Sequence, residues 1–248
     1  MVDSDAIAAG PVLSLLFAEG QRPGVESIAD LAMAETGQLR LSISHFPADG
    51  ANWLELLAAG LTFDCHGLAP GDAAADPPKG ALLGLEAMPQ GEAITLSPAP
   101  HLASGTGLLP VVRVLAGVGA ELVGLPGSKA VFWHPAQCWM APEYYRKVVG
   151  NWLDGGAFPA LGLTSLQRGA DGAMTSVGLG LLTGQELRFE PDRNLTPAAV
   201  ARIAVRLIHL LIETGPMHHA CEMEGPEGER LLIEPNRKGA LLRVTIRK

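Results

Sequence analysis

The sequence predicts an α+β protein in which helices pack on a mixed or mostly antiparallel sheet. Short apolar or alternating segments bounded by glycine and proline predict strands, and several longer segments have the 3.6-residue period of helices. No short repeat of fixed period occurs, which disfavours a solenoid or a propeller. The 48% hydrophobic and 18% charged residues of the 248-residue chain are typical of a folded core.

The first third of the chain alternates strands and helices. The apolar Pro11–Glu19 segment has the length of a buried strand, and Val25–Thr36 has helical spacing. Leu39–Ser44 alternates apolar and polar residues, as a half-buried strand does. Trp53–Leu57 is interpreted as a short helix, and the Pro/Gly/Asp-rich Leu68–Lys79 segment as a loop.

The middle of the chain predicts a hairpin, two helices and a strand between them. Gly80–Pro89 and Ala93–Pro98 are expected to pair as strands around a Gln-Gly turn. A long apolar helix is expected over Ser104–Val123, weakened by its glycines. The Ala130–His134 strand is followed by a helix over Pro142–Asp154.

The last third predicts a meander, one long helix and three closing strands. Ala160–Gln167, Ala173–Leu182 and Glu186–Glu190 form the predicted meander. Thr196 is the expected N-cap of a helix that ends before Gly215. The closing strands are predicted at His219–Glu224, Leu231–Glu234 and Ala240–Ile246.

The length allows two domain organisations. The chain forms either a single α+β unit over residues 1–248 or two lobes. The first lobe would comprise 1–68 with 80–128, interrupted by the 69–79 loop, and the second 129–248; both could be ferredoxin-like.

Composition argues against nucleic-acid and membrane partners. The net charge of −8 comes without a cluster of Lys and Arg that could neutralise phosphates. The two most apolar stretches contain Arg113 and Glu121, and Arg202 and Arg206, which disfavours a membrane span. The acidic N-terminus, Met1–Asp5, lacks the basic region of a secretory signal. An odd number of cysteines, three, favours a reducing compartment, so we expect a cytoplasmic protein.

Cysteine and histidine residues fall into three small groups. They are Cys65-His66, His134 with Cys138, and His218-His219 with Cys221. None has the paired spacing of a metal-binding motif, so His218, His219 and Cys221 are only weak metal candidates and no cofactor is predicted.

Cys138 is the best candidate nucleophile. It precedes a predicted helix whose N-terminal amides could lower a thiol pKa, with His134 as a partner. A buried cysteine that fills core volume is the alternative interpretation.

Five residues between positions 133 and 145 form the candidate binding region. Aromatic side chains with one polar end suit a pocket wall or an interface, and core packing is the alternative. The candidates are Trp133, His134, Trp139, Tyr144 and Tyr145.

The order of elements resembles a bacterial family known as domain of unknown function 4261 (DUF4261). The resemblance rests on the Val12–Phe17 strand, the His45–Ala48 segment, the Ala130–Trp133 strand and the Ser176–Leu187 segment. In Ser176–Leu187 the family pattern is T-x-G-L-x-x-F-G-x-x-E. Residues that fit this pattern are Gly178, Leu179, Leu182 and Glu186, whereas Ser176 and Thr183 depart from it. The resemblance implies a divergent member and brings no activity, cofactor or catalytic residue.

The missing catalytic and nucleotide-binding signatures favour a non-enzymatic protein that binds a partner protein or a small ligand. The alternative is a cysteine- or metal-dependent enzyme that uses Cys138 with His134, His218 or His219. A homodimer also stays open.

Overall fold

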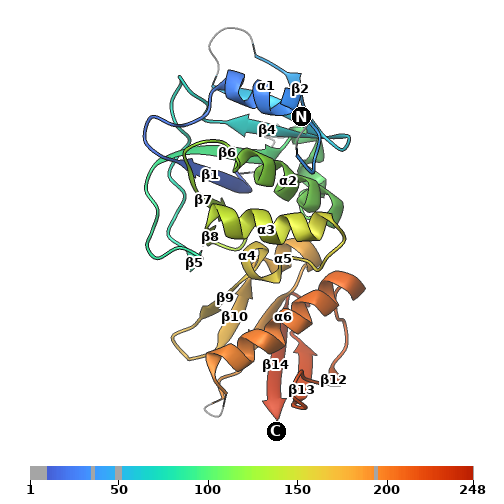
Figure 1. Cartoon of the computed structure of the whole chain (residues 1–248). Helices are drawn as coiled ribbons and strands as arrows, with labels where there is room; N and C mark the ends of the chain where they lie inside the picture. Colours follow the sequence, from blue (N-terminus) through green and yellow to red (C-terminus); the bar gives the residue numbers. More distant parts are fainter. Residues whose placement is uncertain (1–9, 35–36, 48–51, 193–194, 248) are drawn as a thin grey trace, which may run out of the picture. The chain divides into compact units, whose positions relative to one another are not determined.

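The computed structural model describes residues 10–34, 37–47, 52–192 and 195–247, and it divides into two compact units (Figure 1). Unit 1 comprises Met1–His134 with Trp139–Asp154, and unit 2 comprises Pro135–Cys138 with Gly155–Lys248. Each unit contains a sheet and helices, which confirms the α+β class. Three predictions lie outside the described residues: the Met1–Asp5 terminus, the helix end at Thr36, and Ala48 in the resemblance.

The sheet of unit 1 has eight strands in the order β2-β3-β4-β6-β1-β7-β8-β5. From β2 to β7 every neighbouring pair is antiparallel, as predicted. Its strands are β1 (Leu13–Phe17), β2 (Leu41–His45), β3 (Trp53–Ala58), β4 (Leu61–His66), β5 (Ala81–Leu83), β6 (Glu92–Pro98), β7 (Ser128–Trp133) and β8 (Cys138–Met140).

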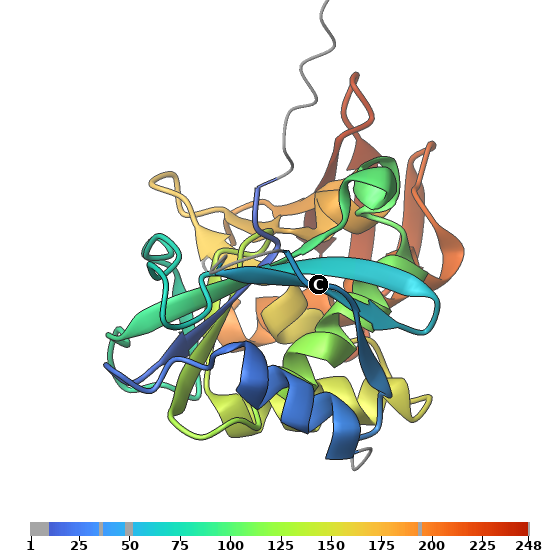
Figure 2. The same cartoon turned by 90° about the horizontal axis from the view of Figure 1, so that it is seen from above.

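Three helices cover one face of this sheet (Figure 2). They are α1 (Val25–Ala34), α2 (Leu109–Leu122) and α3 (Pro142–Leu153), and a short 3-10 helix, η1 (Pro100–Gly105), precedes α2. A Cβ atom on Gly119 of α2 would lie 2.3 Å from Leu13 Cδ2 on β1. The glycine that weakens the helix in isolation therefore lets α2 pack closely on the central strand.

Near β1 and β7, the opposite face of the sheet is covered by the segment between β4 and β6. Leu16, Phe132 and Trp139 form a buried cluster there with two alanines, and Leu82 and Leu85 pack against it. The Leu68–Lys79 segment is irregular, as the sequence predicts.

Unit 1 contains the ferredoxin-like topology. Along the chain, β1, α1, β4, β6, α2 and β7 follow the βαββαβ order, and their strands lie in the order β7-β1-β6-β4. The β2–β3 pair extends this sheet at one end, and β8 and β5 extend it at the other. Because β7 pairs with β1, the boundary between the units falls after Asp154 and not at residue 128.

Unit 2 has a six-stranded sheet in the order β12-β13-β14-β11-β10-β9, in which only the β11–β14 pair is parallel among the described ladders. The single long helix, α6, buries Ile203, Leu207 and Leu211, and Thr196 caps it by accepting from the amide of Ala199. This arrangement is not the predicted second ferredoxin-like lobe. The elements are α4 (Ala160–Leu163), β9 (Ser165–Arg168), β10 (Met174–Val177), α5 (Leu179–Thr183), β11 (Glu186–Phe189), α6 (Pro197–Thr214), β12 (Cys221–Glu224), β13 (Arg230–Pro235) and β14 (Leu241–Arg247).

Four secondary-structure predictions are wrong. The end of the predicted Ala173–Leu182 strand forms the short helix α5 instead. Trp53–Ala58 is a strand that alternates buried and half-buried residues, and it forms a hairpin with β4 around Ala59 and Gly60, both at positive φ. β5 and β6 are strands but not partners, because β6 lies between β4 and β1. The first residues of the predicted Ala160–Gln167 strand form the short α4 segment instead.

Candidate functional site

The aromatic residues of the predicted binding region lie mainly in the core. Trp133, Trp139 and Tyr145 are at most 2% exposed, and Tyr144 is half-buried. The Tyr145 hydroxyl donates to the carbonyl of Ala116 at 2.9 Å, and the Trp139 indole donates to the carbonyl of Pro78 at 3.1 Å. Burial makes these three residues structural, which is the core-packing alternative, and the polar ends of Trp139 and Tyr145 are satisfied.

His134 is paired with a residue that the sequence did not single out. Its Nε2 lies 2.7 Å from the hydroxyl oxygen of Ser14 on β1. Burial lowers the pKa of His134 to about 4, so the imidazole is neutral at pH 7. A serine beside a neutral histidine resembles a nucleophile with its base, but Ser14 is fully buried, so the pair satisfies two interior polar groups.

The cysteine candidates lack the features of a reactive site. Burial raises the pKa of the Cys138 thiol to about 12, so it stays protonated, whereas a nucleophilic cysteine needs a lowered pKa. His218 and His219 are exposed, and the Cys221 thiol is 3.9 Å from the Met217 sulfur. Within the described part of the chain, no three His, Cys, Asp or Glu residues could together hold a metal ion.

The segment that carries the family resemblance forms a local hydrogen-bond network in unit 2. The Glu186 carboxylate accepts from the amides of Gly178 and Gly180, at 2.9 and 2.8 Å, and from the Ser176 hydroxyl. Ser176 in turn accepts from the amide of Leu187 at 2.7 Å. Desolvation raises the pKa of Glu186, against the lowering effect of these hydrogen bonds. The network fixes the β10–α5–β11 turn, so the pattern has a structural role here.

An apolar groove runs between α1 and β2 at the end of the unit 1 sheet. It consists of two hollows, of about 560 and 450 Å³, that share Phe46. The first hollow lies at the start of α1 and the second lies along its later turns. Lining residues of the first are Gly24, Val25, Glu26, Ser27, Phe46, Pro47, Trp53, Ala69 and Pro70, and those of the second are Ala29, Ala32, Met33, Arg40, Leu41, Ser42, Ile43 and Phe46.

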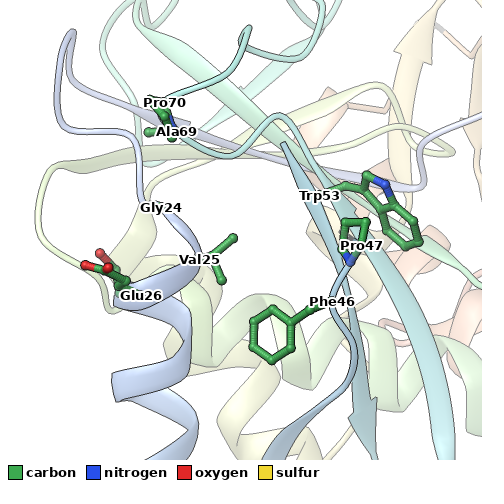
Figure 3. A pocket seen from close by; sticks show the side chains of 9 residues that line it. Gly24, Val25, Glu26, Phe46, Pro47, Trp53, Ala69 and Pro70 are labelled. Atoms are coloured by element: carbon green, nitrogen blue, oxygen red, sulfur yellow. The ribbon is translucent and has the colours of Figure 1, made fainter. Parts of the chain in front are cut away.

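Two large apolar side chains on this groove are exposed. Met33 is 71% exposed and Phe46 is 53% exposed. Figure 3 shows Val25 and the Phe46 ring pointing into the space between the helix and the strand, whereas the Glu26 carboxylate points away from it. A contiguous apolar surface of this kind is typical of an interaction site.

One wall of the first hollow belongs to a stack of rings. The Trp53 ring centroid lies 5.6 Å from that of His45 and 5.5 Å from that of His66, and the Trp53 and His66 rings are stacked. Next to this stack, burial raises the pKa of Asp64, and nearby His66 lowers it. These rings hold Trp53 in place at the edge of the groove.

Comparisons of the chain with protein-family models, curated proteins and solved structures gave no significant match. The resemblance to DUF4261 therefore stays a prediction. None of the helices in the described residues is long and apolar enough to cross a membrane.

Sequence reasoning missed the groove, although weak signals were present. The apolar stripe of α1 is wider than one core contact needs, since only Ile28 is fully buried while Ala29 and Ala32 line the groove. Phe46 was noticed only as part of the family resemblance. Its exposure depends on β2 being the last strand of the sheet, which is a tertiary property.

Proposed function

We propose that this chain is a non-enzymatic binding protein whose partner or ligand occupies the groove between α1 and β2. The exposure of Met33 and Phe46 on the rim of two adjoining apolar hollows carries the proposal. Full burial of such a side chain is worth roughly 1.5–3 kcal/mol, and binding would recover the part of it that corresponds to the exposed area of each. The described lining of the groove contains no cysteine or histidine, and its serines, Ser27 and Ser42, have no neighbouring histidine or lysine base among the lining residues, so the groove suits recognition better than catalysis.

The proposal also includes a cellular compartment and a class of partner. The cysteines Cys65, Cys138 and Cys221 are free thiols, which supports a reducing compartment such as the cytoplasm. The net charge of −8 supports a partner other than a nucleic acid.

A photo-reactive phenylalanine analogue in place of Met33 tests this proposal in extract of the source organism. Mass spectrometry of the cross-linked chain detects both protein and small-molecule adducts. The matched control carries the analogue in place of Leu108, which is 61% exposed and lies outside the groove. Discrete adducts are expected from position 33 only, and adding Phe46→Asp should remove them. Equal adducts from both positions, or none from position 33, would refute a binding role for the groove.

A further inference from the structure

The groove lining is mostly apolar and has few polar side chains. Those among the described lining residues of the two hollows are Glu26, Ser27, Arg40 and Ser42. The Ser42 hydroxyl donates to the carbonyl of Leu57 at 3.4 Å, and the Glu26 carboxylate points away from the groove (Figure 3). The lining therefore offers an occupant mainly hydrocarbon surface.

A peptide is a poorer occupant of this lining than a hydrocarbon chain. A peptide brings an N–H and a C=O group with nearly every residue, and each costs free energy when it leaves water without a partner. The few polar side chains of the lining cannot pair with the main-chain groups of a peptide that spans both hollows. A hydrocarbon chain has no such groups, and its burial is favourable in proportion to its apolar area.

Arg40 gives the groove a positively charged end. It lines the second hollow, lies just before β2 begins at Leu41, and is itself exposed. The described lining of this hollow contains no Asp or Glu. A guanidinium group can donate two parallel hydrogen bonds to one carboxylate, so charge complementarity favours an anionic group at this end.

Resting on the binding role proposed above, we infer that the groove binds a single-chain fatty acid. Its carboxylate pairs with Arg40, and its chain lies between α1 and β2, against Met33 and Ile43 and past Phe46 into the first hollow. Met33 adapts to the chain because the methionine side chain is unbranched and flexible. Binding thus removes from water the two apolar side chains that the free protein exposes.

The separation of Arg40 and Phe46 sets the length of the chain. The six residue steps between them span roughly 20 Å when extended. Each C–C bond of about 1.5 Å advances an extended hydrocarbon by about 1.3 Å. A chain of about 12–16 carbons therefore reaches from Arg40 to the first hollow.

Isothermal titration calorimetry of the full chain with dodecanoate, below its micelle concentration, tests this inference. Dodecanoate should bind at a single site. Octanoate, whose chain is too short to pass Phe46, should bind at least about tenfold more weakly because fewer methylene groups are buried. Dodecylammonium has the same chain and the opposite charge, and it should also bind at least about tenfold more weakly.

Protein variants assign the two ends of the ligand. Arg40→Gln should weaken dodecanoate binding about tenfold, whereas Lys147→Gln, which removes a charge at an exposed position of α3 outside the groove, should leave it unchanged. Met33→Ser should weaken dodecanoate binding about threefold to tenfold, and Leu108→Ser, at an exposed position outside the groove, should not. Circular dichroism checks that all four variants fold.

The alternative outcomes separate the inference from the proposed function. Equal affinity for dodecanoate and dodecylammonium, or unchanged binding in Arg40→Gln, would overturn the anionic end, and equal affinity for octanoate would overturn the chain. Binding to phosphatidylglycerol vesicles without binding of monomeric dodecanoate would mean a lipid surface, which also overturns the inference. If dodecanoate does not bind while position 33 gives a protein adduct, the inference is wrong and the binding role stands. If neither occurs, both fail.

Discussion

Two regions of unit 1 contain aromatic residues beside histidines, and the structure uses them in opposite ways. In the Trp133–Tyr145 region, the rings of Trp133, Trp139 and Tyr145 are buried, and the polar ends of Trp139 and Tyr145 are satisfied within the protein. At the α1–β2 end of the sheet, Phe46 is exposed beside Met33, and Trp53 is only half-buried. Residue type alone does not separate the two regions. The position of each strand in the sheet does, since β7 lies inside the sheet and β2 ends it.

The contrast between the two regions would be refuted most clearly if the buried region contributed little to the free energy of unfolding. Trp139→Ala should lower the free energy of unfolding by about 3–5 kcal/mol, because it leaves a cavity beside Leu16 and Phe132. Phe46→Ala, which removes an exposed ring, should cost less than about 1 kcal/mol. Urea unfolding measures both, and a Trp139→Ala cost as small as that of Phe46→Ala would contradict the structural assignment.

A second prediction extends the comparison to Glu186 in unit 2. Glu186→Ala should cost about 1–3 kcal/mol, because it leaves the amides of Gly178 and Gly180 without their acceptor. Glu222→Ala, at an exposed position on β12, should change stability by less than about 0.5 kcal/mol. Thermal or urea unfolding measures both variants. Equal changes in stability for Glu186→Ala and Glu222→Ala would contradict a structural role for the network.

Acid should lower the stability of the folded protein through protonation of His134. Its folded pKa of about 4 lies below the ordinary value of 6.5, so the unfolded chain binds more protons in this window. The contribution of His134 to stability is therefore complete above pH 6.5 and is lost as the pH falls toward 4. After allowance for solvent screening, the loss should be about 1 kcal/mol. In His134→Gln the slope of stability against pH between 6.5 and 4 should be smaller, and an unchanged slope would contradict a buried neutral imidazole.

Substitutions of the groove residues Met33 and Phe46 should have the smallest effect on stability and the largest effect on binding. Met33→Ser and Phe46→Ser should each change the free energy of unfolding by less than about 0.5 kcal/mol, since neither side chain is buried. Phe46→Ser should also remove the photo-adducts expected at position 33. A large loss of stability in either variant would mean that the groove side chains belong to the core.

Local patterns predicted much of the fold. The apolar β1 segment, the capped helix after Thr196 and the proline-started helix at Pro142 carry their signals within a few residues. Trp53–Ala58 was mistaken for a helix because its leucines suit either structure, and the turn at Ala59 and Gly60 was not recognised. The pairing of β6 depends on partners far away in the chain, which no local pattern contains.

The candidate site was less predictable than the fold. Aromatic density pointed to Trp133–Tyr145, because composition cannot distinguish a buried ring from an exposed one. The groove depends on which strand ends the sheet and on the position of α1 beside it. The strand order is set by pairing across the whole of unit 1.

The most direct test compares the two regions within one experiment. The photo-reactive analogue is placed at Met33 in the groove and, in a second protein, at the half-buried Tyr144 of the aromatic region. Both proteins are irradiated in extract of the source organism and their adducts are identified by mass spectrometry. Discrete adducts at position 33 and none at position 144 are the predicted result. Adducts at position 144 with none at position 33 would place the binding surface in the aromatic region and contradict the account.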